Sequence, residues 1–304
     1  MLRKHFLHKI TATAALLVTA NYAALAQALH TAGFTVTMLT KDIGVFTEKG
    51  GTILFAITGK GINIVDSQFQ DTATHLIDEL SKLTSKPYKY LINTHHHADH
   101  TSGNIAFKGK LKHIVAHTNS AINQKAAAIK QKTEEKQLYP TTTWDSTWQV
   151  YLKTEKIICT YYGAAHTNGD IVVWLSKANI VHCGDLVFNR RFPYIDKANG
   201  ANIKSWIQVL QKLQANYTDD TKYVFGHCND KYSVVGTKAD IKAFETYLTQ
   251  LYNYVLTEYQ LGKTKDAILK SKIIPGNQEW YGDGVERGLA AAYQEVDEEA
   301  KGRM

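Results

Sequence analysis

The chain has 304 residues, a formal net charge of +7 and only 4 prolines, and it contains no low-complexity tract that would separate domains. A chain of this length can bury a sizeable core in one large domain. Its lysines are spread along predicted helices without a stripe of arginine and aromatic residues, which disfavours nucleic acid as a partner. Three cysteines, Cys159, Cys183 and Cys228, allow at most one internal disulfide.

Residues 1–26 are typical of a signal peptide. Arg3, Lys4 and Lys9 precede an apolar stretch of small residues, and Ala24-Leu25-Ala26 fits a signal-peptidase site. The stretch is short and interrupted by polar residues, which disfavours a membrane anchor. We therefore expect a periplasmic or secreted protein that has no membrane anchor after cleavage.

The next segments alternate between strand and helix patterns. Strand-like runs occupy 35–39, 52–57 and 61–65. A helix is predicted over 71–83 from its apolar stripe. Thr118 is expected to cap a further helix that extends to Lys132.

One short segment concentrates metal-binding side chains directly after the strand-like run 88–92. Four histidines and one aspartate fall within it: His95, His96, His97, Asp99 and His100. Imidazole and carboxylate groups together bind zinc and similar ions. If the strand continued, alternation would direct His95, His97 and Asp99 to one side, with His100 turning in from a loop. This geometry favours two neighbouring metals.

Three distant residues follow apolar runs and complete a ligand set: His166, Asp185 and His227. The C-terminal end of each strand would present its ligand to a shared site. A solvated loop or a nonspecific metal-collecting tract would need no such partners. Cys183 would share a strand face with Asp185, and we expect it to be a buried apolar residue and not a ligand.

At these positions the chain resembles the metallo-β-lactamase superfamily. The family motif is His-x-His-x-Asp-His, then a distant His, a distant Asp or Cys, and a last His, and each slot is filled between about Gly44 and His227. The resemblance implies an α+β fold, a four-layer αββα sandwich over 27–236, that binds two Zn²⁺, with another divalent metal as the alternative. It implies one ion on His95, His97 and His166, a second on Asp99, His100 and His227, and Asp185 between them.

Further residues refine this resemblance. Asp66 matches an early family aspartate that orients the ligand loop by hydrogen bonds, with helix capping as the alternative. The flavin-linked di-iron branch carries Glu at the position of His97, so iron chemistry is disfavoured. The β-lactamases with a cysteine ligand carry Cys at the position of Asp185, which weakens the expectation of a β-lactam substrate.

The implied activity is hydrolysis by a hydroxide between two metals, with Asp99 as the catalytic residue that orients the nucleophile or relays a proton. An exported di-zinc hydrolase of an amide or ester-like bond is expected, with a β-lactam as one candidate substrate. A thioesterase, lactonase or hydroxyacylglutathione-hydrolase-like enzyme is the alternative. A phosphodiesterase or a non-enzymatic metal-binding protein is less favoured.

Two segments are candidates for contact with a small-molecule substrate. Arg190 and Arg191 follow Asp185 closely and could pair with a substrate carboxylate or phosphate. A surface ion pair, for instance with Asp196, is the alternative. The aromatic connection 139–148 could form a wall of the pocket.

The last part, residues 237–304, is predicted to be a helical extension packed on the core. One helix presents an apolar face: Ile241, Phe244, Leu248, Leu251 and Val255. A second helix is predicted over 284–299, and an earlier one begins near Ile203. Both a monomer and a dimer are compatible with this pattern.

Overall fold

The structure is a computed structural model that describes residues 33–302. The predicted signal peptide, residues 1–26, lies outside the described residues. Within the described part of the chain, no helix is both long enough and apolar enough to cross a membrane.

The first sheet contains seven strands in sequence order: β1 (Thr35–Met38), β2 (Ile43–Thr47), β3 (Ile53–Thr58), β4 (Gly61–Val65), β5 (Tyr88–Ile92), β6 (His113–His117) and β7 (Thr142–Trp144). Strands β1 to β4 are antiparallel and β4 to β7 are parallel. The parallel strands need crossovers, which contain α2 (Gln70–Leu83) and α4 (Thr118–Gln131). The sequence prediction missed β2, and the cap of α4 is His117 instead of Thr118.

The second sheet has the order β15-β13-β11-β10-β9-β8. Its strands are β8 (Thr147–Tyr151), β9 (Lys156–Tyr161), β10 (Ile171–Leu175), β11 (Ile180–His182), β13 (Lys222–Val224) and β15 (Val235–Gly236). A separate pair, β12 (Phe188–Asn189) and β14 (His227–Cys228), runs parallel beside it. Segment 139–148 forms β7 and the start of β8, so it connects the two sheets.

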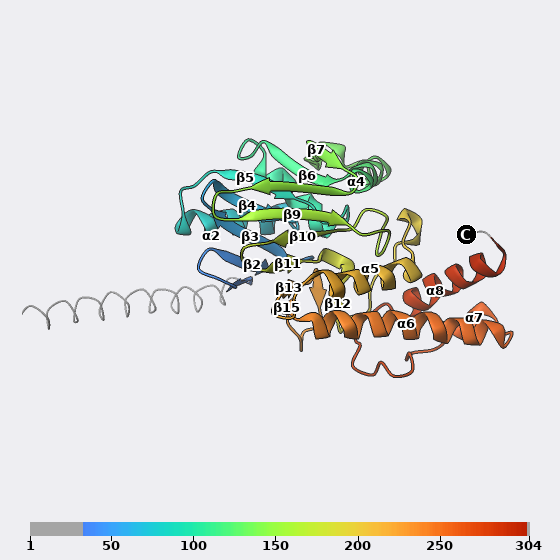
Figure 1. Ribbon diagram of the computed structural model, residues 1–304. Coiled ribbons are helices and arrows are strands. Elements are labelled where there is room, and N and C mark those ends of the chain that lie inside the picture. The colour runs from blue at the N-terminus through green and yellow to red at the C-terminus, as the bar shows by residue number, and fades with distance from the viewer. Residues whose placement is uncertain (1–32, 303–304) are drawn as a thin grey trace, which may run out of the picture.

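Three apolar cores separate four layers (Figure 1). Between the sheets, Val45 and Leu54 of the first sheet share a core with Val173 of the second. On the outer face of the first sheet, Leu76 and Leu80 of α2 are fully buried. The outer face of the second sheet is covered by helices. This arrangement confirms the predicted αββα sandwich of the α+β class.

The C-terminal helices cover the second sheet together with α5 (Ile203–Asn216) (Figure 1). They are α6 (Lys238–Gln260), α7 (Lys265–Leu269) and α8 (Val285–Ala300). All five residues of the predicted apolar face of α6 are fully buried, which confirms that face. Because α5, α6 and α8 share one core with the sheet, the extension is part of the packed body of the protein.

Candidate metal centre

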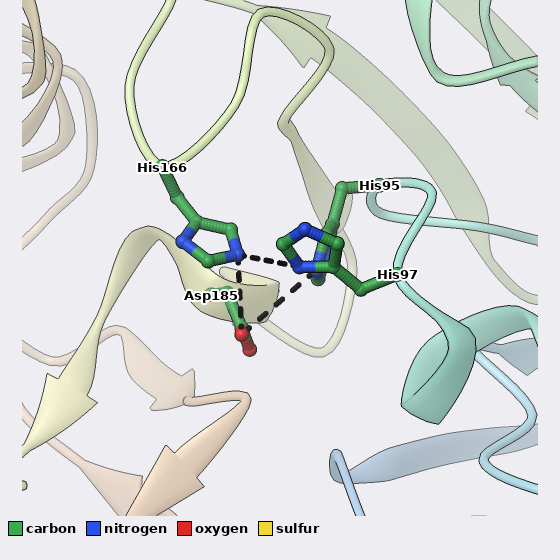
Figure 2. Close-up of side chains that lie close together, drawn as sticks. All are labelled: His95, His97, His166 and Asp185. Atoms are coloured by element: carbon green, nitrogen blue, oxygen red, sulfur yellow. Dashed lines mark hydrogen bonds and ion pairs between the residues drawn. The ribbon is translucent and has the colours of Figure 1, made fainter. Parts of the chain in front are cut away.

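The first ligand cluster joins two loops and a turn near the ends of the strands (Figure 2). His97 Nδ1 lies 3.1 Å from His95 Nε2 and 2.9 Å from His166 Nε2. Asp185 Oδ2 lies 3.8 Å from His95 Nε2 and 3.5 Å from His166 Nε2. The ligands of a tetrahedral zinc lie about 3.4 Å apart, as follows from zinc–ligand bonds of about 2.1 Å. These four side chains therefore have the spacing of a zinc site.

Each histidine of the first cluster is oriented through its other ring nitrogen. His97 Nε2 lies 2.9 Å from Asp196 Oδ2, and His166 Nδ1 lies 2.6 Å from the Tyr194 carbonyl oxygen. His95 Nδ1 lies 3.1 Å from Thr94 Oγ1. Such outer hydrogen bonds fix the tautomer and the ring orientation of metal-binding histidines.

The second cluster contains Asp99, His100 and His227. His227 Nε2 lies 3.1 Å from Asp99 Oδ2, and His100 Nε2 lies 3.1 Å from Asp185 Oδ1. His227 Nε2 is also 3.4 Å from Asp185 Oδ2. The Asp185 carboxylate thus contacts ligands of both clusters, which is the position of a bridging group.

Asp66 supports the second cluster from the end of β4. Its buried carboxylate accepts hydrogen bonds from the Thr94 backbone N–H and hydroxyl, both at 2.7 Å, and lies 2.7 Å from His100 Nδ1. This geometry fits the orienting role and not the helix cap, since Phe69 precedes α2. Asp66 adopts a φ of 61°, a conformation that is uncommon for a residue with a side chain.

Two glycines let the chain approach these ligands closely. A Cβ on Gly51 would lie 2.2 Å from the His100 ring, and a Cβ on Gly226 would lie 1.9 Å from Asp185 Oδ1. Neither position can carry a side chain without moving a ligand. The sequence analysis did not single out either glycine for this role.

The local geometry differs from the predicted strand alternation. Strand β5 ends at Ile92, and Ala98–Thr101 (α3) is a helical turn whose start is marked by a hydrogen bond from the His100 N–H to the His97 carbonyl. Similarly, β11 ends at His182, and Asp185 lies on a 3₁₀ turn. The shared strand face predicted for Cys183 and Asp185 is therefore wrong. Cys183 is buried in an apolar core, and all three cysteines are free.

Charges inside the centre divide the histidines into two groups. Burial, together with the charge of His100, lowers the pKa of His95 well below its usual value, and burial beside His97 lowers the pKa of His166 to about 3. Burial also disfavours a charge on His227 and His100. Nearby carboxylates, led by Asp185, outweigh burial, raising the pKa of His227 to about 9 and that of His100 well above its usual value.

Two buried polar atoms at the junction of the clusters, His100 Nε2 and Asp185 Oδ1, lie 3.1 Å apart but are not aligned for a hydrogen bond, and neither has another hydrogen-bond partner among the described residues. Buried polar groups are almost always satisfied, so such atoms call for an explanation. Both are good zinc ligands, and both point into a group of imidazole and carboxylate donors. The donor set and its unsatisfied atoms therefore fit bound divalent metal.

The predicted substrate-binding arginines make contacts with the C-terminal part of the chain. Arg190 Nη1 lies 3.2 Å from Asp240 Oδ1, and Arg190 Nε lies 3.3 Å from Glu279 Oε1. Arg191 is exposed, and its backbone pairs with Tyr281. Arg190 therefore forms ion pairs, as the alternative interpretation predicted, but its partners are Asp240 and Glu279 and not Asp196.

A cavity of about 710 Å³ adjoins the first cluster. Its lining includes His97, Tyr194 and Asp196, together with residues of α4 and of the turn that follows α4. Lys130 and Lys136 are among these residues, and neither forms an ion pair with another described residue. Neither arginine and none of residues 139–148 is among the lining residues. No sequence motif marks these lining residues, so the cavity could not be predicted from the sequence.

The comparisons with known proteins agree with this geometry. The family model of the metallo-beta-lactamase superfamily matches residues 65–227, more than half of the chain. Metallo-beta-lactamase IND-1 of Chryseobacterium indologenes is 26% identical over 194 residues, which cover 62% of this chain and 76% of the relative. Metallo-beta-lactamase type 2 of Bacillus cereus is 28% identical over 207 residues, covering 65% and 78%.

Solved structures show the same fold. A metallo-beta-lactamase from Pontibacter korlensis superposes with a TM-score of 0.61 at 20% identity, covering 71% of this chain and 99% of that one. A double mutant of the sec-alkyl sulfatase PisA1 gives a TM-score of 0.68 at 15% identity, covering 86% of this chain and 50% of that one. With its ligand motif and four layers, the chain belongs to the metallo-β-lactamase superfamily and is a metal-binding hydrolase of this fold.

Proposed function

We propose that this protein is an exported di-zinc hydrolase that cleaves an amide or ester-like bond of a small molecule. The observation that carries the proposal is the position of Asp185, whose two carboxylate oxygens contact ligands of both clusters. His95, His97 and His166 would hold one ion and Asp99, His100 and His227 the other. Export to the periplasm or the medium is proposed from the signal-like segment 1–26.

When bound, two zinc ions supply a water acidified to a pKa of about 7 and a Lewis acid for the scissile bond. The chain contributes a carboxylate beside this centre. The Asp99 side chain is 29% exposed, more than that of any other predicted ligand in these contacts, and its Oδ2 lies 3.1 Å from His227. Burial disfavours its charge, but His100 and His227 lower its pKa to about 2. We propose that Asp99, ionised at neutral pH, orients the attacking water and accepts a proton.

The cavity beside the first cluster supports a small-molecule substrate, since its volume lies within the usual range for such sites. Its wall combines alanines of α4 with four glutamines: Gln70, Gln124, Gln131 and Gln137. The unpaired ammonium groups of Lys130 and Lys136 would favour an anionic group at the far end of the substrate. The proposal thus moves the expected anion-binding role from the arginines to these lysines.

Two substrate classes follow from separate observations. The names of the relatives support a β-lactam, whose amide bond would be attacked next to a carboxylate. Asp185, in place of the cysteine found in many β-lactamases of this superfamily, favours the alternative of a thioesterase or lactonase. The sec-alkyl sulfatase shares the fold over more of the chain than the Pontibacter protein does, which adds sulfate esters to the compounds worth testing.

The test uses the protein from residue 27 onward, stripped with a chelator and reloaded with zinc. Elemental analysis should find close to two ions per chain. Hydrolysis should be detected for at least one member of a panel of β-lactams, lactones, thioesters, phosphodiesters and alkyl sulfates, and it should disappear in the stripped protein. One ion or none after reloading, or hydrolysis that survives stripping, would overturn the proposal.

A further inference from the structure

The loop that follows the bridging aspartate carries the outer partners of two first-cluster histidines. We call residues 187–202 the partner loop. Its Tyr194 carbonyl contacts His166 Nδ1 at 2.6 Å, and its Asp196 carboxylate contacts His97 Nε2 at 2.9 Å. The position of the partner loop therefore sets the orientation of both rings.

One end of the partner loop is held by a buried carboxylate on the last helix. Glu295 of α8 is 0% exposed. Its Oε2 accepts a hydrogen bond from the Ile203 N–H at 2.9 Å, and its Oε1 accepts one from the Lys204 N–H at 3.1 Å. These are the first N–H groups of α5, where a negative charge is stabilised. Glu295, a residue of another helix, thus caps the N-terminus of α5.

The same carboxylate also reaches the residue next to Asp196. Glu295 Oε2 lies 3.2 Å from Lys197 Nζ, and the Lys197 side chain is only 13% exposed. Within the partner loop, Asp196 also accepts a hydrogen bond from the Asn199 amide at 2.7 Å, which fixes the carboxylate that faces His97. The path from α8 to the first cluster is therefore Glu295, Lys197, Asp196 and His97.

The other end of the partner loop is held by the same C-terminal region. Arg190 pairs with Asp240 of α6 and with Glu279. The Tyr281 N–H donates to the Arg190 carbonyl at 3.2 Å, and the Phe192 N–H donates to the Tyr281 carbonyl at 3.1 Å. Both ends of the loop are thus attached to residues after position 236.

We infer that the C-terminal extension is a positioning element for the first metal cluster and that Glu295 is its principal positioning residue. Glu295 touches no metal ligand, and it acts through Lys197 and the partner loop. In the second cluster, Asp66 supports His100, and His227 pairs with Phe188 at the start of the partner loop, the end that Glu295 does not contact. Loss of Glu295 should therefore weaken metal binding at the first cluster selectively. The inference rests on the two-metal centre proposed above.

The test substitutes Glu295→Gln, which keeps the shape but removes the charge and places an amide N–H₂ against a backbone N–H or Lys197. Zinc affinity is measured by competition with a chelator in two backgrounds. Asp99→Ala leaves only the first cluster intact, and His97→Ala leaves only the second. We expect about 10-fold weaker zinc binding in the Asp99→Ala background and no change in the His97→Ala background. Loss of a residue that hydrogen-bonds a metal ligand directly weakens metal binding about 10–100-fold, and Glu295 acts less directly.

Glu298→Gln is the matched control, because Glu298 lies on the same helix and approaches the same lysine at 3.8 Å, but its side chain is 31% exposed. Circular dichroism must show every variant folded at the temperature used. Cobalt(II) substituted for zinc should keep a four-coordinate absorption spectrum in Glu298→Gln and lose intensity in Glu295→Gln. Combining Glu295→Gln with Asp196→Asn should give a less than additive loss, because both act on His97.

The outcomes separate the two proposals. If the parent protein takes up no zinc, the proposed function fails. If the parent takes up two ions and folded Glu295→Gln binds zinc as the parent does, only the positioning role is overturned. Equal losses at both clusters, or an equal loss in Glu298→Gln, would also overturn it, since either result indicates a general loss of stability.

Discussion

The two ligand clusters share Asp185 but are supported by different parts of the molecule. The second cluster is backed by the first sheet: Asp66 at the end of β4 holds His100 and the Thr94 backbone at 2.7 Å. In the first cluster, His166 and His97 are backed by Tyr194 and Asp196 of the partner loop, and His95 by Thr94. One support is a fully buried carboxylate at the end of a strand of the first sheet, and the other is a loop attached to the helical extension.

This difference assigns separate roles to the first sheet and to the C-terminal extension. Asp66, at the end of the buried strand β4, holds His100 with little freedom, so His100 should keep its position whenever the core is folded. A loop keeps its shape only through its own contacts, and the partner loop contacts Glu295 through Lys197 and contacts Asp240 and Glu279 through Arg190. Local opening of the C-terminal region should therefore affect the first cluster before the second.

The largest expected effect comes from removing the shared residue. Asp185→Ala should lower zinc content at both clusters and reduce hydrolysis by at least about 10³-fold, since loss of metal-centred charge stabilisation costs several kcal/mol. Elemental analysis and a rate measurement on the best panel substrate check this. Asp230→Ala, at an exposed aspartate three residues after His227, is the control and should match the parent. Two retained ions and parental rates would contradict the bridging role.

The clusters should also differ in how zinc uptake depends on pH. In the metal-free protein, His100 and His227 have raised pKa values, the latter about 9, so zinc must displace their protons at pH 7. His95 and His166 have lowered pKa values and carry no such protons. Affinity should thus rise by up to about 100-fold per pH unit at the second cluster between pH 7 and 8, and much less at the first. Chelator competition in the Asp99→Ala and His97→Ala backgrounds separates them.

The same protons affect the stability of the metal-free protein. A histidine whose pKa is raised by folding stabilises the fold below its unfolded pKa of about 6.5, and this contribution is lost as pH rises through the folded value. For His227 that loss falls between about pH 6.5 and about pH 9. Urea denaturation of the metal-free protein should show lower stability at pH 9 than at pH 7. His227→Gln should reduce that difference, and an unchanged difference would contradict the assignment.

Replacing one support at a time sharpens the comparison. Asp66→Asn should weaken zinc binding about 10–100-fold at the second cluster and lower the free energy of unfolding by about 3 kcal/mol, because a buried carboxylate with three partners is lost. Asp196→Asn should weaken the first cluster by a similar factor with a smaller cost of about 1 kcal/mol. Zinc titration and urea denaturation measure both quantities. Equal effects on both clusters in either variant would show that the supports are not separate.

The sequence predicted the sheet-backed region better than the loop-backed one. The buried face of α6 and the segments that carry the candidate ligands follow from local patterns of a few residues, and the four layers follow from the family resemblance of those segments. β2 was missed because its short run contains Gly44, which the structure explains by the Phe55 ring lying where a Cβ would be. The role of Asp196 could not be read locally, since its position depends on Glu295, which lies about a hundred residues later and contacts neighbouring Lys197.

Substrate contact by Arg190 and Arg191 stays a prediction, but the partners of Arg190 could not be read locally either. Arg190 follows Asp185 closely along the chain, yet Asp240 and Glu279 hold its guanidinium from the helical extension. The histidine ligands are different, since buried strand ends fix the direction of the chain there. Short-range position in sequence is therefore a good guide to a site at a strand end and a poor one inside a long loop.

The smallest expected effect tests which cluster the substrate approaches. The cavity is lined by His97 of the first cluster and by its partner Asp196, and Lys130 and Lys136 also line it. Because both lysines are exposed, each should contribute at most about 1 kcal/mol to binding an anionic group, so Lys136→Ala or Lys130→Ala should raise KM up to about 5-fold with kcat and zinc content unchanged. The effect should be absent for a neutral ester of the same substrate. Arg191→Ala is the matched control, because Arg191 is exposed and lies outside the cavity. A larger change in KM for Arg191→Ala than for either lysine variant would indicate that the anionic group binds at the segment after Asp185 and not at the lysines.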